Sequence, residues 1–389
     1  MAARKRPAAK AKEYRDFAHI GPGTLAGRFL RRFWQPVYVA KDLAPGIPMR
    51  IKRFGEFFTL YRGESGAFHL VGDRCPHRRT QMSLGWVEGE CIRCFYHGWV
   101  FDGAGRCVEQ PAEKSSFARK VRIDAYPVRE YLGLVFAYLG EGAPPELPRF
   151  PELESERGVL AAVAHAVPCN YFQRIENDLD ETHIHFVHKV SIDLVDSLIE
   201  VPQIKVRESA YGIYREGHRT TQLGEEVRYG HYLMPNTLLV DLPPSPENKD
   251  WSIHLAWRVA VDDESMITFT ASRRAPQAGA PKQSDGERKW KSADYYVEEI
   301  LAGRMRVQDV DPDYPRLFVV QDNVALAGQG RMVERGKERL GQSDAGITLL
   351  RKLWERELKA LAEGKKLKEW RRTSERLALY LGGGTKELV

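Results

Sequence analysis

Two cysteine–histidine pairs stand close together in the first third of the chain. The first is Cys75-Pro-His77 and the second is Cys94-Phe-Tyr-His97, with 16 residues between them. Thiolate sulfur and neutral imidazole nitrogen are ligands for iron and zinc. Pairs this short, each on its own tight loop, suit a two-iron cluster in which Cys75 and Cys94 bind one iron and His77 and His97 bind the other. Exchanging two thiolates for imidazoles removes negative charge and raises the reduction potential above that of an all-cysteine [2Fe–2S] centre.

A structural zinc site is the alternative interpretation of the same residues. Two cysteines and two histidines also satisfy tetrahedral zinc, and Cys91 offers a further thiolate at the spacing of a zinc finger. Against zinc, a Cys-x-His pair is too short for the usual finger knuckle, and no second histidine follows at finger spacing. We therefore expect the iron cluster, with Cys91, Cys107 and Cys169 outside it.

The residues around both pairs resemble the cluster loops of Rieske proteins. Gly72-Asp73-Arg74 precedes the first pair, and Gly98-Trp99 and Phe101-Asp102-Gly103 follow the second. Respiratory Rieske proteins carry a disulfide at the places that Thr80 and Tyr96 fill here, so that bridge cannot form. This difference resembles the lower-potential Rieske centres of oxygenases. A Rieske centre passes on one electron at a time, so the protein needs an electron donor and an acceptor.

A second group of metal-binding side chains lies at residues 170–188, with the sequence NYFQRIENDLDETHIHFVH. On the predicted helix Asp180 and His183 are three residues apart, so the carboxylate can orient that imidazole. His183 and His188 are five apart, which is about 140° of rotation on an ideal helix. The helix must therefore bend or end if both are to bind one ion. Two histidines and one carboxylate would leave the other positions of iron open for O2.

Taken alone, this segment is also consistent with a solvated helix face on which Glu181 and His185 pair without a metal. Beside the cluster motif, it resembles the catalytic signature of Rieske non-haem iron oxygenases, Glu176-Asn177-x-x-Asp180-x-x-His183-x4-His188. The resemblance extends over residues 24–360 or so. It points to the phthalate-dioxygenase-like branch of oxygenase (alpha) subunits, which contains aromatic-acid dioxygenases and demethylating monooxygenases.

The resemblance assigns roles to individual residues. It implies that His183 and His188 are iron ligands, that Asp180 is an acidic bridge between the metal centres, and that Asn177 supports catalysis near the iron. The third ligand should be a carboxylate far downstream. Asp322 is the expected residue, because Gln321-Asp322-Asn323 opens the stretch QDNVALAGQG, which is similar to the family's ligand segment. Its competitors lie in a proline-broken loop and are Asp309, Asp311 and Asp313.

The same resemblance implies the terminal oxygenase component of a multicomponent system. Such a component uses O2 and electrons from an NAD(P)H-dependent reductase, with or without a ferredoxin, to hydroxylate, cis-dihydroxylate or demethylate a small aromatic or related substrate. Each subunit would hold one [2Fe–2S] cluster and one mononuclear Fe(II). Relatives assemble as head-to-tail homotrimers, which here would place His77 or His97 of one subunit against Asp180 of the next. The alternative is a Rieske electron carrier whose second domain binds a ligand without metal.

The order of elements predicts an α+β protein. An amphipathic helix at Thr24–Trp34 precedes short β-rich runs that continue to Leu139, as in an all-β domain. Beyond a proline-rich stretch, strand-like runs between 205 and 273 and helices between 287 and 380 predict an antiparallel sheet with helices on one face. The resemblance implies that this is a helix-grip fold of the START/Bet v 1 type. The expected divisions are 1–34 (basic mobile arm and helix), 35–150 (Rieske domain) and 151–389 (catalytic domain).

The substrate pocket is expected between the helix of His183 and the sheet. Met234, Asn236 and Val324–Leu326 are the candidate lining residues, and Glu181 would discourage an anionic substrate if it faced the pocket.

Composition sets the remaining limits. A hydrophobic content of 43% and a charged content of 29% are ordinary for a globular protein. Residues 1–12 hold five Lys or Arg and no acid, but no basic patch interleaved with aromatics follows, so we expect neither nucleic acid nor a membrane as a partner. No run approaches 18 apolar residues. Five cysteines, two of them in the cluster, make no disulfide framework, and a cytoplasmic location is expected.

Overall fold

The computed structural model describes residues 13–154, 158–189, 200–221, 224–242, 252–274 and 290–370, together with 376, 377 and 379. The expected basic arm at 1–12 lies outside the described residues.

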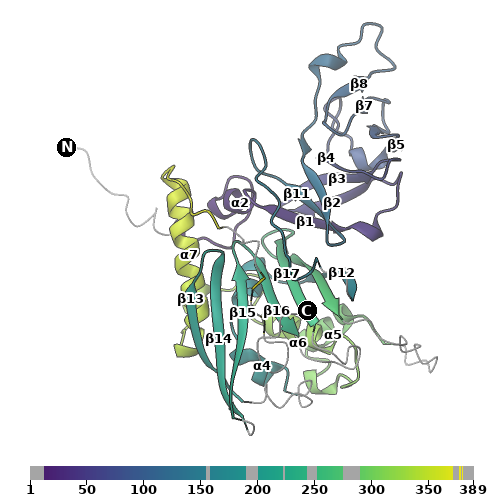
Figure 1. Ribbon diagram of the computed structural model, residues 1–389. Coiled ribbons are helices and arrows are strands. Elements are labelled where there is room, and N and C mark those ends of the chain that lie inside the picture. The colour runs from purple at the N-terminus through teal and green to yellow at the C-terminus, as the bar shows by residue number, and fades with distance from the viewer. Residues whose placement is uncertain are drawn as a thin grey trace.

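Three small antiparallel sheets make up the N-terminal part of the chain. The first contains β1 (Trp34–Val39), β11 (Leu134–Tyr138) and β10 (Val128–Tyr131). The second contains β2 (Met49–Arg53), β3 (Glu56–Arg62), β4 (Phe68–Gly72) and β9 (Ala125–Tyr126). The third contains β5 (Trp86–Glu88), β6 (Cys91–Arg93), β7 (Val100–Phe101) and β8 (Cys107–Glu109). In Figure 1 the third sheet lies at the end of the molecule farthest from the C-terminal part.

The C-terminal part is built on one seven-stranded antiparallel sheet in the order β12-β18-β17-β16-β15-β14-β13. Its strands are β12 (Val159–Val167), β13 (Gln203–Glu208), β14 (Gly212–Thr221), β15 (Gly224–Leu233), β16 (Thr237–Leu242), β17 (Ser252–Ala260) and β18 (Met266–Arg274). The helices are α2 (Leu25–Leu30), α3 (Tyr171–Asn177), α4 (Thr182–Val187), α5 (Ala293–Leu301), α6 (Leu317–Ala327) and α7 (Ala345–Ala362).

Trp354 anchors the helix layer. It is fully buried on α7, and the rings of Phe29, Tyr171 and Phe172 surround it at centroid distances of 5.1, 6.2 and 5.2 Å. The apolar residues of α7 recur at helical spacing and face the core, as expected of an amphipathic helix. The N-terminal helix α2 therefore packs with the C-terminal part, beside α7 in Figure 1.

The two faces of β17 contact different layers, because side chains alternate along a strand. Arg258 points to the helix layer, where it binds Asp178 just after α3. Trp257 points to the opposite face, where it packs edge-on against Phe136 of β11 and Phe150, at 5.2 and 5.5 Å. The sheet is thus covered by helices on one side and contacted by the N-terminal part on the other, and the predicted α+β architecture is confirmed.

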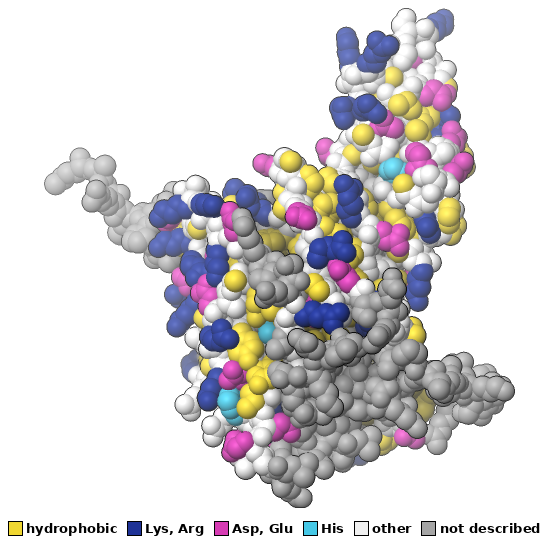
Figure 2. All heavy atoms as spheres, viewed as in Figure 1, with side chains coloured by type: hydrophobic (Ala, Val, Ile, Leu, Met, Phe, Trp, Pro, Cys, Tyr) yellow, Lys and Arg dark blue, Asp and Glu magenta, His cyan; other side chains and the backbone are white. Residues whose placement is uncertain are grey.

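Basic and acidic side chains are interspersed over the face shown in Figure 2. Within the described part of the chain, no helix is both long enough and apolar enough to cross a membrane.

Candidate active site

The two cysteine–histidine pairs lie on neighbouring loops at the tip of the N-terminal part. Cys75 and His77 follow β4, and Cys94 and His97 connect β6 to β7. Each loop is closed by a backbone hydrogen bond near its cysteine: Cys75 N donates to Thr80 O at 2.9 Å, and Cys94 N donates to the Trp99 carbonyl at 2.8 Å. These closures turn both loops tightly enough for their side chains to meet.

The four predicted donors do meet at this tip. The rings of His77 and His97 are 4.4 Å apart between centroids, and His77 stacks on Trp99 at 4.5 Å. The thiols of Cys75 and Cys94 are buried and hydrogen-bonded to each other. That bond, with the backbone N–H groups of Tyr96 and His97, lowers the pKa of Cys94 to about 6. The same contact raises the pKa of Cys75 well above its usual value, so without a metal the two sulfurs share one proton and Cys94 is the thiolate, the form that binds metal.

The donor set fits a two-iron cluster better than a single ion. His77 Nδ1 is buried, and among the described residues it has no hydrogen-bond partner, so its lone pair or proton is available to a group that the side chains surround. Three or more donors converge on one point at only one place in the described part of the chain, and that place is not this tip. Four donors that do not converge on one point are consistent with a cluster that has one iron at the cysteine pair and one at the histidine pair.

The second predicted site lies where the helix at 170–188 is interrupted. α3 ends at Asn177 and α4 begins at Thr182, so the predicted helix is two short helices with a break between them. α4 ends at Val187, and His188 follows it in a non-helical conformation. The prediction that the helix must bend or end between His183 and His188 is confirmed, since the end of α4 allows both rings to face the same point.

A backbone carbonyl orients His183, in place of the carboxylate that we expected. His183 Nδ1 contacts the carbonyl oxygen of Asp180, whereas its distance to Asp180 Oδ2 is 4.0 Å. A carbonyl oxygen only accepts hydrogen bonds, so Nδ1 carries the proton and the lone pair of the neutral ring is on Nε2. The Asp180 carboxylate instead accepts from the N–H groups of Thr182 and His183, at 2.9 and 3.2 Å, and so caps α4.

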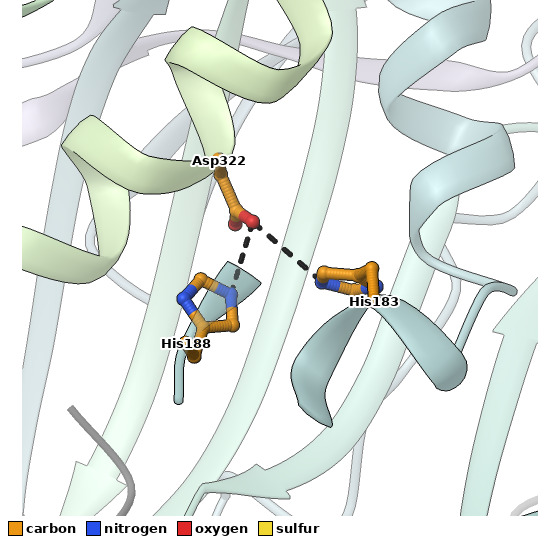
Figure 3. Close-up of side chains that lie close together, drawn as sticks. All are labelled: His183, His188 and Asp322. Carbon is orange, nitrogen blue, oxygen red and sulfur yellow. Dashed lines mark ion pairs between the residues drawn. The ribbon is translucent and has the colours of Figure 1, made fainter. Parts of the chain in front are cut away.

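An amide oxygen orients His188. Its Nδ1 donates to Gln321 Oε1 at 2.9 Å, so the lone pair of this ring is also on Nε2. Asp322, the next residue on α6, directs Oδ1 to within 3.6 Å of His183 Nε2 and 3.1 Å of His188 Nε2 (Figure 3). Asp322 Oδ1 is buried and accepts no hydrogen bond from the described residues. Three unprotonated donor atoms thus face one point.

The electrostatics of this group favour the protonation states that bind a metal. Burial lowers the pKa of His183, which keeps the ring neutral. Burial alone would raise the pKa of Asp322, but the charge of Arg174 and the nearby His188 and His183 hold it well below the usual range for a carboxyl. A neutral imidazole pair and an ionised carboxylate are the forms that coordinate iron.

The other predicted residues have different surroundings. Asn177 accepts a short hydrogen bond from Arg174 and lies one contact away from Asp322. Asp309, a competing ligand, pairs with Arg306 at 2.6 Å on the surface, away from the two histidines. The competitors Asp311 and Asp313 are likewise outside the group of three donors that meets in the described residues.

Three of the residues considered for the pocket make other contacts. Asn236 is buried in the core, where it exchanges hydrogen bonds with Gln35 of β1 and donates to the Arg258 carbonyl at 2.8 Å. Met234 is part of the same core. Glu181 is buried against the sheet, where it pairs with Arg219 at 3.3 Å.

The sequence analysis did not identify the two arginines that lie next to the metal-binding group, Arg174 and Arg258. Arg174 donates to Asp322 Oδ2 at 2.7 Å, and Arg258 binds Asp178 through two hydrogen bonds. An arginine on a helix carries no local signal of this role, since Asp322 is 148 residues away in the sequence. The distance in sequence, rather than any unusual residue type, concealed the contact.

Comparisons with known proteins agree with both sites. Residues 33–131 match the family model of the Rieske [2Fe-2S] domain. The chain is 31% identical to the 5,5'-dehydrodivanillate O-demethylase oxygenase subunit of a Sphingobium species over 91% of its own length and 81% of that protein. It is 32% identical to the phenoxybenzoate dioxygenase subunit alpha of Ectopseudomonas oleovorans, over 89% and 84%, and 29% identical to the 3-chlorobenzoate-3,4-dioxygenase oxygenase subunit of Comamonas testosteroni, over 91% and 89%.

The fold is shared with solved structures. The oxygenase in the reduced oxygenase–ferredoxin complex of carbazole 1,9a-dioxygenase superimposes with a TM-score of 0.62 at 22% identity, over 94% of this chain and 99% of that one. An electron carrier would need only the cluster loops. This chain also has the two-histidine-one-carboxylate group, and oxygenase subunits match it along most of their length, so the electron-carrier alternative is excluded. The chain belongs to the Rieske non-haem iron oxygenases, as an oxygenase subunit that carries a [2Fe–2S] cluster and a mononuclear iron.

Proposed function

We propose that His183, His188 and Asp322 are the ligands of the mononuclear iron, and that Cys75, Cys94, His77 and His97 hold the cluster. The observation that carries the iron assignment is the convergence of Asp322 Oδ1 with the two Nε2 atoms, all three without protons. Ligands at roughly 2.1 Å from one ion and at right angles to each other are roughly 3 Å apart, which these separations approach. In this proposal residues 35–150 form the electron-accepting domain and 151–389 the catalytic domain.

When bound, the ferrous ion would activate O2. The ion and the reduced cluster would each supply one of the two electrons that this requires. The protein's own residues prepare the site. Asp180 O and Gln321 Oε1 hold the two rings in the tautomer that offers Nε2, and Arg174 keeps Asp322 ionised before metal arrives. Three protein ligands leave the remaining positions of the ion open to O2, beside which a substrate can bind.

An aromatic acid is the substrate class that we propose. The three relatives compared above are named for a divanillate, a phenoxybenzoate and a chlorobenzoate. On the helix-facing side of the sheet, His165 of β12 and His254 of β17 share the field of Arg258 and Arg174. Burial and these cations lower the pKa of both rings to about 3, so both histidines are neutral. A neutral imidazole has one N–H, which could donate a hydrogen bond to an anionic group on the substrate.

Electrons would come from an NAD(P)H-dependent reductase, with or without a ferredoxin, and pass between subunits of a head-to-tail homotrimer. Each chain exposes apolar rings at both of the regions that such an assembly would join. Trp86, Phe95 and Tyr96 are exposed beside the cluster loops, and Phe186 is exposed on α4. Exposed apolar groups of this size mark contact surfaces.

Metal analysis of ligand variants tests the assignment. His183→Ala, His188→Ala and Asp322→Ala should each lose about one of three irons per chain while the Rieske EPR signal remains. His185→Ala removes a histidine of the same helix that points elsewhere, and it should keep all its iron. Retention of the mononuclear iron in Asp322→Ala would refute the assignment. For the substrate class, O2 uptake and product analysis should show turnover with aromatic acids and none with the corresponding amides.

A further inference from the structure

Arg174 is placed to control how the third ligand binds. Its side chain comes from α3 and is only 14% exposed. Nη1 donates to Asp322 Oδ2 at 2.7 Å and also makes a short hydrogen bond to Asn177 Oδ1. Asp322 therefore has two different oxygens: Oδ1 faces the two histidines, and Oδ2 is held by a guanidinium.

The guanidinium is itself fixed by a buried ion pair. Arg174 Nε lies 3.9 Å from Asp178 Oδ1. Arg258 of β17 donates two hydrogen bonds to Asp178, at 2.8 and 2.6 Å. It also donates to Oγ1 of Thr268, on the neighbouring strand β18, at 3.0 Å. The chain of contacts runs from the sheet through α3 to α6, so Arg174 cannot leave Asp322 without breaking charge-assisted bonds in the interior.

We propose that Arg174 is a positioning residue that restricts Asp322 to binding the mononuclear iron through Oδ1 alone. A carboxylate that binds through both oxygens needs the ion close to Oδ2, where the dication would approach the guanidinium and be repelled by it. Restriction to one oxygen leaves a coordination position unoccupied by protein. Asn177 takes part indirectly, since its amide oxygen holds the guanidinium in place. The inference rests on the proposed role of Asp322 as an iron ligand.

Arg174→Met and Arg174→Gln test this, because both remove the cation and retain much of the side-chain volume. The Gln variant also keeps a hydrogen-bond donor for Asn177, and it carries the test if the Met variant does not fold. The readouts are crystal structures of iron-loaded protein and near-infrared magnetic circular dichroism of the Fe(II) site, with the cluster contribution subtracted by means of Asp322→Ala. We expect one short iron–carboxylate oxygen distance in the wild type. In both variants we expect two, with the Fe(II) bands shifted as for one additional ligand.

Arg335→Met is the matched control. Arg335 is 18% exposed and pairs with Glu176 on the same helix α3 at 2.9 Å, but it makes no contact with Asp322. This variant should keep the wild-type spectrum and a single short distance. Wild-type coordination in both Arg174 variants, or two-oxygen binding already in the wild type, would overturn the inference. Mononuclear iron that persists in Asp322→Ala would instead refute the ligand assignment, so the two failures are distinguishable.

Discussion

Neutral oxygen atoms, not acids, fix the tautomers of His183 and His188, the two proposed iron ligands. A carboxylate hydrogen-bonded to a ligand histidine adds negative charge to the site, whereas Asp180 O and Gln321 Oε1 orient the rings without charge. The charges nearest to the two Nε2 atoms are then those of Asp322 and Arg174. The ring orientation and the net charge can therefore be changed separately by substitution.

Gln321→Leu removes the acceptor for His188 Nδ1 and so releases the ring and its tautomer. Loss of such a partner typically weakens metal binding by about 10- to 100-fold. We expect that loss in Fe(II) titrations of protein from which the mononuclear iron has been removed by a chelator. Gln321→Glu keeps an acceptor oxygen and should bind Fe(II) at least as tightly as the wild type. Equal affinity of Gln321→Leu and the wild type would show that His188 is oriented by other contacts.

At the cluster, Cys94→Ala or Cys75→Ala should abolish the brown colour and the Rieske EPR signal. No nearby group is placed to replace a thiolate bond to iron, because the other described thiols of this region, Cys91 on β6 and Cys107 on β8, lie on strands and outside the loop tips. Cys91→Ser should leave both signals unchanged. An EPR signal that survives in Cys94→Ala would mean that the cluster ligands are assigned wrongly.

At the scale of elements, the sequence predicted what local patterns encode. The region of strand-like runs predicted between 205 and 273 contains β17 and β18, and the helical region predicted between 287 and 380 contains α7. The end of α4 before His188 followed from the spacing of the histidines, whereas the break between α3 and α4 did not. The strand β12 was missed, because its alanine-rich sequence VLAAVAHAV has neither the alternation nor the bulky residues that indicate a strand.

Contacts between distant segments could not be predicted in this way. The tight turn at Met234–Asn236 divides one apolar run into β15 and β16, and the buried side chain of Asn236 then binds Gln35, 201 residues away. Arg174 and Asp322 are related in the same manner. Their pairing depends on how helices pack on the sheet, which one sequence does not encode locally.

Glu181 ties the metal-binding helix α4 to the sheet. It is buried beside Arg215 and Arg219 of β14, and those cations lower its pKa against the effect of burial. Glu181→Gln would leave two buried arginines without their anion, and a broken buried pair costs about 3–5 kcal/mol. Urea unfolding should show a loss of this order. Glu299→Gln, at an exposed pair with Arg304, should leave the unfolding midpoint unchanged. An equal midpoint for Glu181→Gln would mean that α4 is held by its apolar contacts alone.

At the scale of the whole molecule, the two metal sites are at opposite ends of one chain. In Figure 1 the sheet that carries the cluster loops is at one end, and α4 and α6 are near the other, with β1, β11 and the large sheet between them. This arrangement supports the proposed electron transfer between subunits over transfer within one chain. Phe186 on the one side and Phe95 and Tyr96 beside the cluster loops on the other are exposed, and Asp180 is 29% exposed.

The assembly can be measured directly. Light scattering of the purified protein should give a mass about three times the 44.4 kDa of one chain, as expected of a closed ring. Phe186→Lys places a charge on a side chain that is 65% exposed, so it should reduce the trimer without unfolding the chain. Lys189→Met, a substitution at an exposed residue just beyond α4, is the control and should remain trimeric. A monomeric wild type would contradict the proposed route for electrons.

Asp180 separates electron transfer from metal binding, because its two functions use different atoms. Its backbone carbonyl orients His183, and its Oδ1 caps α4. Asp180→Asn preserves both, since asparagine also caps helices well, and changes only the charge. We therefore expect full iron content and an intact trimer. If the carboxylate bridges to a cluster histidine of the neighbouring subunit, losing the charge weakens that hydrogen bond, and cluster oxidation should slow by orders of magnitude.

The measurement is single-turnover kinetics of reduced protein mixed with O2 and substrate. Asp309→Asn, at an aspartate on the surface, is the control. Asp178→Asn would not serve, because it disturbs the buried pair with Arg258. Wild-type rates in Asp180→Asn would confine Asp180 to its local role as the cap of α4.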